Sequence, residues 1–281
     1  MNDVADRPLG VFDSGLGGLT VVAALRSALP QEHILYLGDN ARVPYGTRSA
    51  ETVVRYARGC ARVLTARGVK ALVVACNTVS AVALDMLRAE LDLPVVGVVE
   101  PGARAAVRVV EALADEATPA KIGVLGTRGT IASGAYTRAV AQLSTRLEVI
   151  GQPAPLLVPL VEEGWIEGQV PELTVRKYVE PLILAGARVL VLGCTHYPLL
   201  APLIAAVARD LAGAEVPIVD SARATAETLK ELGNESRITL RASGESPGRL
   251  EVLVTDLPAS FEAVARRFLG ADLPDAQQID L

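Results

Sequence analysis

Two cysteines end apolar runs of this 281-residue sequence, and each is followed by short polar side chains. Cys76 stands in "VVACNTVSA" and Cys194 stands in "LVLGCTHYPLL". A buried cysteine is most often a small apolar core residue, and nucleophilic catalysis would need only one thiol and a base. Two thiols at equivalent strand ends instead match a reaction that needs two proton carriers on opposite sides of its substrate.

Racemisation of an α-carbon is such a reaction, because a base takes the α-proton from one face while an acid supplies a proton to the other face. A thiol can serve in both roles, since its ordinary pKa of about 8.5 lies close to neutrality. We expect Asp13 and His196 to assist one thiol each. A lone histidine is more often an ordinary hydrogen-bonding residue of a cleft, but the position of His196 between Cys194 and Tyr197 favours a role in the reaction.

The elements that must position these residues alternate between short β-branched runs and longer stretches with helical periodicity. This alternation is typical of βαβ units. Most runs are continuously apolar, as expected for strands that helices cover on both faces. The predicted strands are residues 9–12, 33–37, 71–74, 95–98, 121–125, 147–150, 189–192 and 216–219. We therefore predict an α/β fold with parallel sheets.

The two halves of the chain resemble each other. "GVKALVVACNTVSAVALDML" aligns without a gap with "GARVLVLGCTHYPLLAPLI" and places Cys76 over Cys194, and "GVFDSG" resembles "GVLGTR". Any two βα units share apolar letters, but matched cysteines and matched polar turns favour a true repeat. We predict a first domain of residues 1–100, to which 211–281 return, and a second domain of residues 101–210, with the active site in the cleft between them.

Polar residues directly after the predicted strands should gather at one edge, because the carboxyl ends of the strands carry the site in open α/β sheets. Besides the two thiols they are Asp13, Ser14, Asp39, Pro44, Tyr45, Gly46, Asn77, Thr78, Thr127, Thr195 and His196. The turn "SGLGGLT" is either a tight βα turn or an anion site, for which a substrate carboxylate is the best candidate. "EEGWIEGQVPELTV" has no counterpart in the first half and predicts a loop or short helices over the cleft.

Composition excludes several classes of protein. A net charge of -5 gives no reason to expect nucleic acid or an anionic membrane as a partner. No signal pattern and no apolar run of membrane-spanning length is present, so we expect a cytoplasmic protein. Three cysteines without close Cys or His pairs argue against a disulfide framework and a zinc site, and we expect Cys60 to be structural. No lysine follows a predicted strand as a pyridoxal phosphate enzyme requires, so we expect neither cofactor nor metal.

Seven segments in order, from about residue 9 to 269, resemble the bacterial glutamate racemases of the aspartate/glutamate racemase superfamily. They are "GVFDSGLGGLT", "YLGDNARVPYG", "VVACNTVSA", "GTRGTIASGAY", "LVEEGW", "LVLGCTHYPLL" and "VDSARATAETL", and "VTDLPASFEAVARRFLG" resembles the C-terminal helix of that family. The resemblance implies two pseudo-symmetric flavodoxin-like domains and interconversion of L- and D-glutamate without a cofactor, which supplies D-glutamate for peptidoglycan. Gly126 and Asn40 are mild departures from the usual pattern.

The resemblance also assigns roles to residues. Cys76 and Cys194 are the acid/base thiols, with Asp13 and His196 as supporting residues. Glu163 in "LVEEGW" is a further assistant, although Glu162 beside it is an alternative. Substrate contacts fall on Asp13, Ser14, Tyr45, Gly46, Asn77, Thr78, Thr195 and His196. Glutamate is thus the expected partner, a homodimer is compatible with the resemblance, and two other functions stay open: an aspartate racemase on the same scaffold and a non-catalytic small-molecule binding or regulatory protein.

Overall fold

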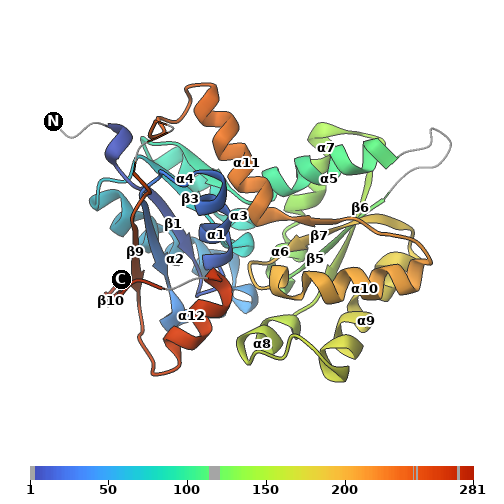
Figure 1. The fold of residues 1–281 in the computed structure, drawn as a ribbon. Coiled ribbons are helices and arrows are strands. Elements are labelled where there is room, and N and C mark those ends of the chain that lie inside the picture. Colours follow the sequence, from blue (N-terminus) through green and yellow to red (C-terminus); the bar gives the residue numbers. More distant parts are fainter. Residues whose placement is uncertain (1–3, 114–120, 243, 245, 271–272) are drawn as a thin grey trace.

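Two lobes, each built on a parallel sheet, make up the computed structural model (Figure 1), which describes residues 4–113, 121–242, 244, 246–270 and 273–281. The first sheet has the order β10-β9-β2-β1-β3-β4 and the second has the order β6-β5-β7-β8. The strands are β1 (Leu9–Asp13), β2 (Ile34–Gly38), β3 (Ala71–Val74), β4 (Val95–Gly97), β5 (Lys121–Gly126), β6 (Glu148–Pro153), β7 (Ala187–Gly193), β8 (Ile218–Asp220), β9 (Leu250–Val254) and β10 (Ala276–Gln278).

The two sheets repeat one topology. The order β2-β1-β3-β4 in the first sheet corresponds strand for strand to β6-β5-β7-β8 in the second, and all pairings are parallel. This is the doubly wound arrangement in which the carboxyl ends of the central strands hold the ligand site. The predicted α/β class with two related halves is confirmed, and all eight predicted strands are present. β9 and β10, which extend the first sheet beyond β2, were not predicted.

Helices cover both faces of the sheets (Figure 1). They are α1 (Leu19–Ala28), α2 (Ala50–Ala66), α3 (Asn77–Val82), α4 (Leu84–Glu90), α5 (Val99–Leu113), α6 (Arg128–Ala132), α7 (Ala135–Leu143), α8 (Leu157–Glu162), α9 (Gln169–Leu184), α10 (Ala201–Ala212), α11 (Ser221–Asn234) and α12 (Phe261–Leu269), with short 3-10 helices at Val4–Asp6, Asn40–Arg42, Tyr45–Thr47 and Tyr197–Leu200. No helix within the described ranges is both long enough and apolar enough to cross a bilayer.

The chain returns to the first lobe near its end. α11 packs against both α1 and α5, α12 packs against α1, and β9 and β10 join the first sheet. The division into residues 1–100 with 211–281 and residues 101–210 stays a prediction. It differs from the sheets in one respect, because β8 lies beyond residue 210 and still pairs with β7 in the second sheet.

Candidate active site

A cavity of about 300 Å³ lies at the carboxyl ends of the strands and receives one thiol from each sheet. Cys76 follows β3 and Cys194 follows β7, and each is only 6% exposed. We call this the central cavity; its lining residues are Ser14, Val43, Pro44, Tyr45, Gly46, Thr47, Cys76, Asn77, Thr78, Thr127, Arg128, Pro155, Val158, Pro159, Glu162, Cys194, Thr195 and His196. Of the eleven catalytic and substrate-contact residues that the sequence nominated, Asp13 and Glu163 do not line it.

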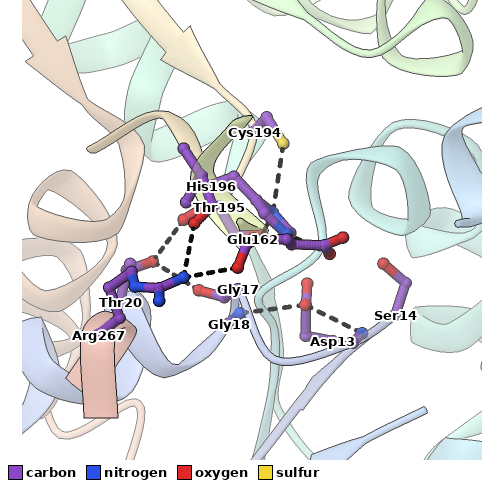
Figure 2. Close-up of polar contacts among 12 residues, drawn as sticks. Asp13, Ser14, Gly17, Gly18, Thr20, Glu162, Cys194, Thr195, His196 and Arg267 are labelled. Carbon is purple, nitrogen blue, oxygen red and sulfur yellow. Dashed lines mark hydrogen bonds and ion pairs between the residues drawn. The ribbon is translucent and has the colours of Figure 1, made fainter. Parts of the chain in front are cut away.

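His196 and Glu162 stand beside Cys194, as Figure 2 shows. Sγ of Cys194 lies 3.9 Å from Nδ1 of His196, and Nε2 of His196 lies 3.0 Å from Oε1 of Glu162. Burial lowers the pKa of His196, but the contacts with Cys194 and Glu162 outweigh it and raise that pKa to about 10. His196 is therefore an imidazolium at neutral pH and places a positive charge next to this thiol.

The opposite charge lies behind Cys76. Sγ of Cys76 lies 3.5 Å from Oγ of Ser14, and the adjacent Asp13 is fully buried. Burial and the negative charge of Asp13 raise the pKa of Cys76 to about 12, so this thiol keeps its proton at neutral pH. Asp13 was predicted to contact the substrate, but the structure places it behind the cavity wall, where it acts on Cys76 through its charge.

The glycine-rich turn after β1 binds the protein's own carboxylate. Gly15 and Gly18 donate their backbone N–H groups to Oδ2 of Asp13 at 3.1 and 3.0 Å. Because Asp13 already occupies these two amides, the structure favours the tight βα turn over the anion site as the interpretation of this segment. Gly17 instead meets the other half of the molecule: a Cβ at this position would lie 2.6 Å from Nδ1 of His196. The turn needs glycine for close packing, which was the alternative interpretation.

Glu162, and not Glu163, belongs to the central cavity. Glu162 is the last residue of α8 and lines the cavity, whereas Glu163 follows the helix and is exposed. The segment from Glu162 to Val175 was predicted to be a loop or short helices over the cleft. Of this segment only Glu162 lines the cavity. Its second half, from Gln169, begins the sixteen-residue helix α9, which packs against α10. Adjacent glutamates point in different directions, so the end of α8 decides which one faces His196.

A buried carboxylate fixes the loop that carries Tyr45. Asp39, which is fully buried, accepts hydrogen bonds from the hydroxyls of Tyr45 and Thr255 and from the guanidinium of Arg42 at 2.7 Å. Tyr45 and the following Gly46 line the central cavity. Because Thr255 lies directly after β9, the returning C-terminal segment helps to shape this wall of the cavity.

Hydroxyl and amide groups join the two lobes at the cavity. Oγ1 of Thr78 lies 2.9 Å from Oγ1 of Thr127 and 3.3 Å from Oγ1 of Thr130. Oδ1 of Asn77 accepts a hydrogen bond from the hydroxyl of Tyr136 at 2.8 Å. Thr130 and Tyr136 were not predicted, because neither directly follows a strand. Of these side chains, Asn77, Thr78 and Thr127 line the central cavity and can donate hydrogen bonds to the carboxylates of a small substrate.

The described residues offer no evident place for a metal ion or a Schiff base. Within the described part of the chain, no group of three or more His, Cys, Asp or Glu residues is arranged to hold a metal. Lys70 precedes β3, at the opposite end from Cys76, and its Nζ lies 2.6 Å from Oε2 of Glu32. The polar groups that line the central cavity are therefore thiols, hydroxyls, amides, the guanidinium of Arg128 and the His196–Glu162 pair.

Comparison with known proteins supports the family resemblance that the sequence motifs indicate. The chain is 47% identical to the glutamate racemase of Geobacter metallireducens over 98% of this chain and 97% of the relative. Its structure matches an isoform of glutamate racemase from Bacillus anthracis with a TM-score of 0.88 at 38% identity, covering 99% of this chain and 98% of the other. It also matches the glutamate racemase from Francisella tularensis in complex with D-glutamate with a TM-score of 0.86 at 34% identity, covering 98% of each chain. The family model for Asp/Glu/Hydantoin racemase matches residues 19–229, and the chain therefore belongs to this family.

Proposed function

We propose that the protein is an isomerase that interconverts L- and D-glutamate, with Cys76 and Cys194 as its acid and base. The observation that carries this proposal is that each of the two repeated sheets delivers one thiol to the same cavity. Relatives named as glutamate racemases, matched over nearly the whole chain, support glutamate as the substrate. The product D-glutamate would supply peptidoglycan synthesis.

The reaction requires one proton transfer on each face of the substrate. The thiolate of one cysteine removes the α-proton of glutamate and becomes a thiol, leaving an electron pair at the α-carbon that its carboxylate helps to disperse. The thiol of the other cysteine then donates its proton to the opposite face and becomes the thiolate. The configuration inverts, all protons are accounted for, and the reverse reaction exchanges the two roles.

The surroundings of the thiols suit this exchange. A thiolate at Cys76 is a stronger base than an ordinary one, since burial and the charge of Asp13 raise the pKa of Cys76 to about 12. At Cys194 the imidazolium of His196 attracts the negative charge that the sulfur acquires when it loses its proton. Before substrate binds, Cys76 keeps its proton, and the positive charge of His196 lies beside Cys194.

Polar groups around the cavity bind the substrate. The predicted contacts Ser14, Tyr45, Gly46, Asn77, Thr78, Thr195 and His196 all line the central cavity. Thr127, which also lines it, adds a hydroxyl that sits within hydrogen-bond distance of Thr78. Hydroxyls and amides from both lobes surround the substrate, so its binding favours an arrangement in which the lobes stay together and exclude water from the thiols.

The test is exchange and racemisation in deuterated water without any added cofactor. The purified protein is incubated with L-glutamate and, in parallel, with L-aspartate. The optical signal is followed by circular dichroism and the α-deuterium by NMR. We expect the glutamate signal to decay to zero with deuterium at the α-carbon, and the aspartate signal to persist. Preferential turnover of aspartate would assign the sister activity, and persistence of both signals would contradict an amino-acid racemase and favour a binding or regulatory protein.

A further inference from the structure

The C-terminal helix α12 reaches from the first lobe to the catalytic pair of the second. In the sequence it connects β9 to β10 of the first sheet, and it packs against α1. Arg267 on this helix donates from one guanidinium nitrogen to the backbone carbonyls of Val161 and Glu162, at 3.1 and 2.5 Å. The dashed lines from Arg267 in Figure 2 mark these two hydrogen bonds.

Arg267 completes the end of α8. The last carbonyls of a helix have no partners within the helix, and a cation at this end also interacts favourably with the helix dipole. The Val161 carbonyl additionally accepts the N–H of Gly164. Gly164 lacks the Cβ that would lie 2.9 Å from Cζ of Arg267, so the turn leaves room for the guanidinium.

The neighbouring Phe268 contacts the other member of the pair. Its ring packs edge-on against the imidazole of His196, with centroids 4.9 Å apart and an interplanar angle of 77°. Two consecutive residues of α12 thus hold the backbone of Glu162 and the ring of His196, and these are the two groups joined by the 3.0 Å contact beside Cys194.

We infer that Arg267 is a positioning residue that holds Glu162 against His196 and thereby supports the proton transfers of Cys194. Positioning matters here because the Glu162 side chain is 42% exposed, so orientations in solvent compete with its contact with His196. Without the guanidinium, the carbonyls of Val161 and Glu162 lose these two hydrogen bonds to the first lobe. This inference rests on the proposed function for its catalytic readout.

The test measures isotope effects on each half of the reaction. When proton transfer at Cys194 slows, the primary deuterium isotope effect rises for the enantiomer whose α-proton goes to Cys194 and falls for the other enantiomer. We expect Arg267→Met to lower kcat by at most about fivefold, the loss expected when the Glu162–His196 contact itself is removed, with isotope effects that shift in the same direction as in Glu162→Gln and in the opposite direction to Asp13→Asn. Arg267→Lys should restore part of the rate. Arg266→Met, on the same helix but directed to Glu262, is the matched control and should keep the wild-type pattern.

A second readout does not depend on turnover. The imidazole nitrogens of His196 are followed by NMR in the unliganded protein, and Arg267→Met should shift them towards the values of Glu162→Gln, whereas Arg266→Met should not. Equal isotope effects in the wild type and Arg267→Met, together with unchanged imidazole shifts, would overturn the inference. If the wild type itself fails to racemise glutamate, the proposed function fails, and the imidazole shifts alone decide the positioning role. If Arg267→Met does not fold, the same two measurements on Arg267→Lys decide it.

Discussion

The two thiols occupy equivalent places in two copies of one fold but lie in opposite electrical surroundings. Cys76 lies beside Ser14 with the buried carboxylate of Asp13 behind it, and its pKa is raised to about 12. Cys194 lies 3.9 Å from the imidazole of His196, whose pKa is raised to about 10. A negative charge thus stands behind one thiol and a positive charge behind the other.

The asymmetry arises at positions where the repeat itself is broken. When "GVFDSG" is aligned with "GVLGTR", Asp13 corresponds to Gly126, and when Cys76 is aligned with Cys194, His196 corresponds to Thr78. Each half therefore carries a charged residue where the other half has a neutral one. The shared fold places both sulfurs at the central cavity, and these two substitutions give the sulfurs surroundings of opposite charge.

Removing either thiol should have the largest effect. Cys76→Ser and Cys194→Ser each eliminate one of the two proton carriers, so we expect racemisation to fall by about 10³-fold in both. The rate is measured by circular dichroism of L-glutamate solutions. Cys60→Ala is the control, since Cys60 is fully buried on α2 and does not line the cavity. Full turnover in either serine variant would refute the two-thiol mechanism.

Neutralising Asp13 or His196 should have an intermediate effect on the rate and should distinguish proton transfer at Cys76 from proton transfer at Cys194. We expect Asp13→Asn and His196→Asn each to slow racemisation by about 10²-fold. Because Asp13 acts on Cys76 and His196 on Cys194, the isotope effects for α-deuterated L- and D-glutamate should shift in opposite directions in the two variants. Asp13→Asn should also speed alkylation of Cys76, since it removes a charge that raises the pKa of this thiol. Identical isotope patterns would show that the two sides are not separately controlled.

A smaller loss of activity is expected from a substitution at Gly17, where the two halves of the chain are in contact. In Gly17→Ala, the new Cβ would press on the imidazole of His196 without altering any charge. We expect kcat to fall by about tenfold, as a displacement of catalytic groups predicts, with little change in melting temperature. Gly59→Ala on α2 provides a comparison, because nothing lies within 4 Å of the Cβ it would add. An unchanged kcat in Gly17→Ala would mean that the His196 ring can shift without cost.

The fold was predictable where its signal is local. The eight predicted strands are continuous apolar runs, and the repeat placed both thiols correctly at strand ends. β9 was missed because "LEVLV" follows a long polar stretch without a helix to frame it, and β10 because "AQQ" has no apolar pattern at all. β9 is specified by its pairing with β2, which connects residues about two hundred positions apart in the sequence. β10 is specified by its pairing with β9, and no local sequence pattern indicates that pairing.

The site was predictable in its residue types but not in its orientations. Sequence places Asp13 after a strand, but only the structure shows that Gly15 and Gly18 turn their amides onto it. The choice between Glu162 and Glu163 depends on where α8 ends. Arg267 carried no signal, because its contact with the Glu162 carbonyl spans 105 positions of the chain.

The smallest effect should come from Glu162, whose side chain is 42% exposed, so solvent screens its charge. Glu162→Gln should reduce the rate roughly fivefold, the equivalent of one exposed ion pair, and should lower the pKa of His196 from about 10.

A histidine with a raised pKa stabilises the fold fully below its ordinary pKa of 6.5 and loses this contribution as pH rises through the folded value. The wild type should therefore exceed Glu162→Gln in melting temperature most clearly near pH 6.5, and the difference should vanish above pH 10. Glu163→Gln, one residue along and exposed, should show no such pH-dependent difference; if it matched Glu162→Gln, general surface charge rather than the contact with His196 would explain the effect.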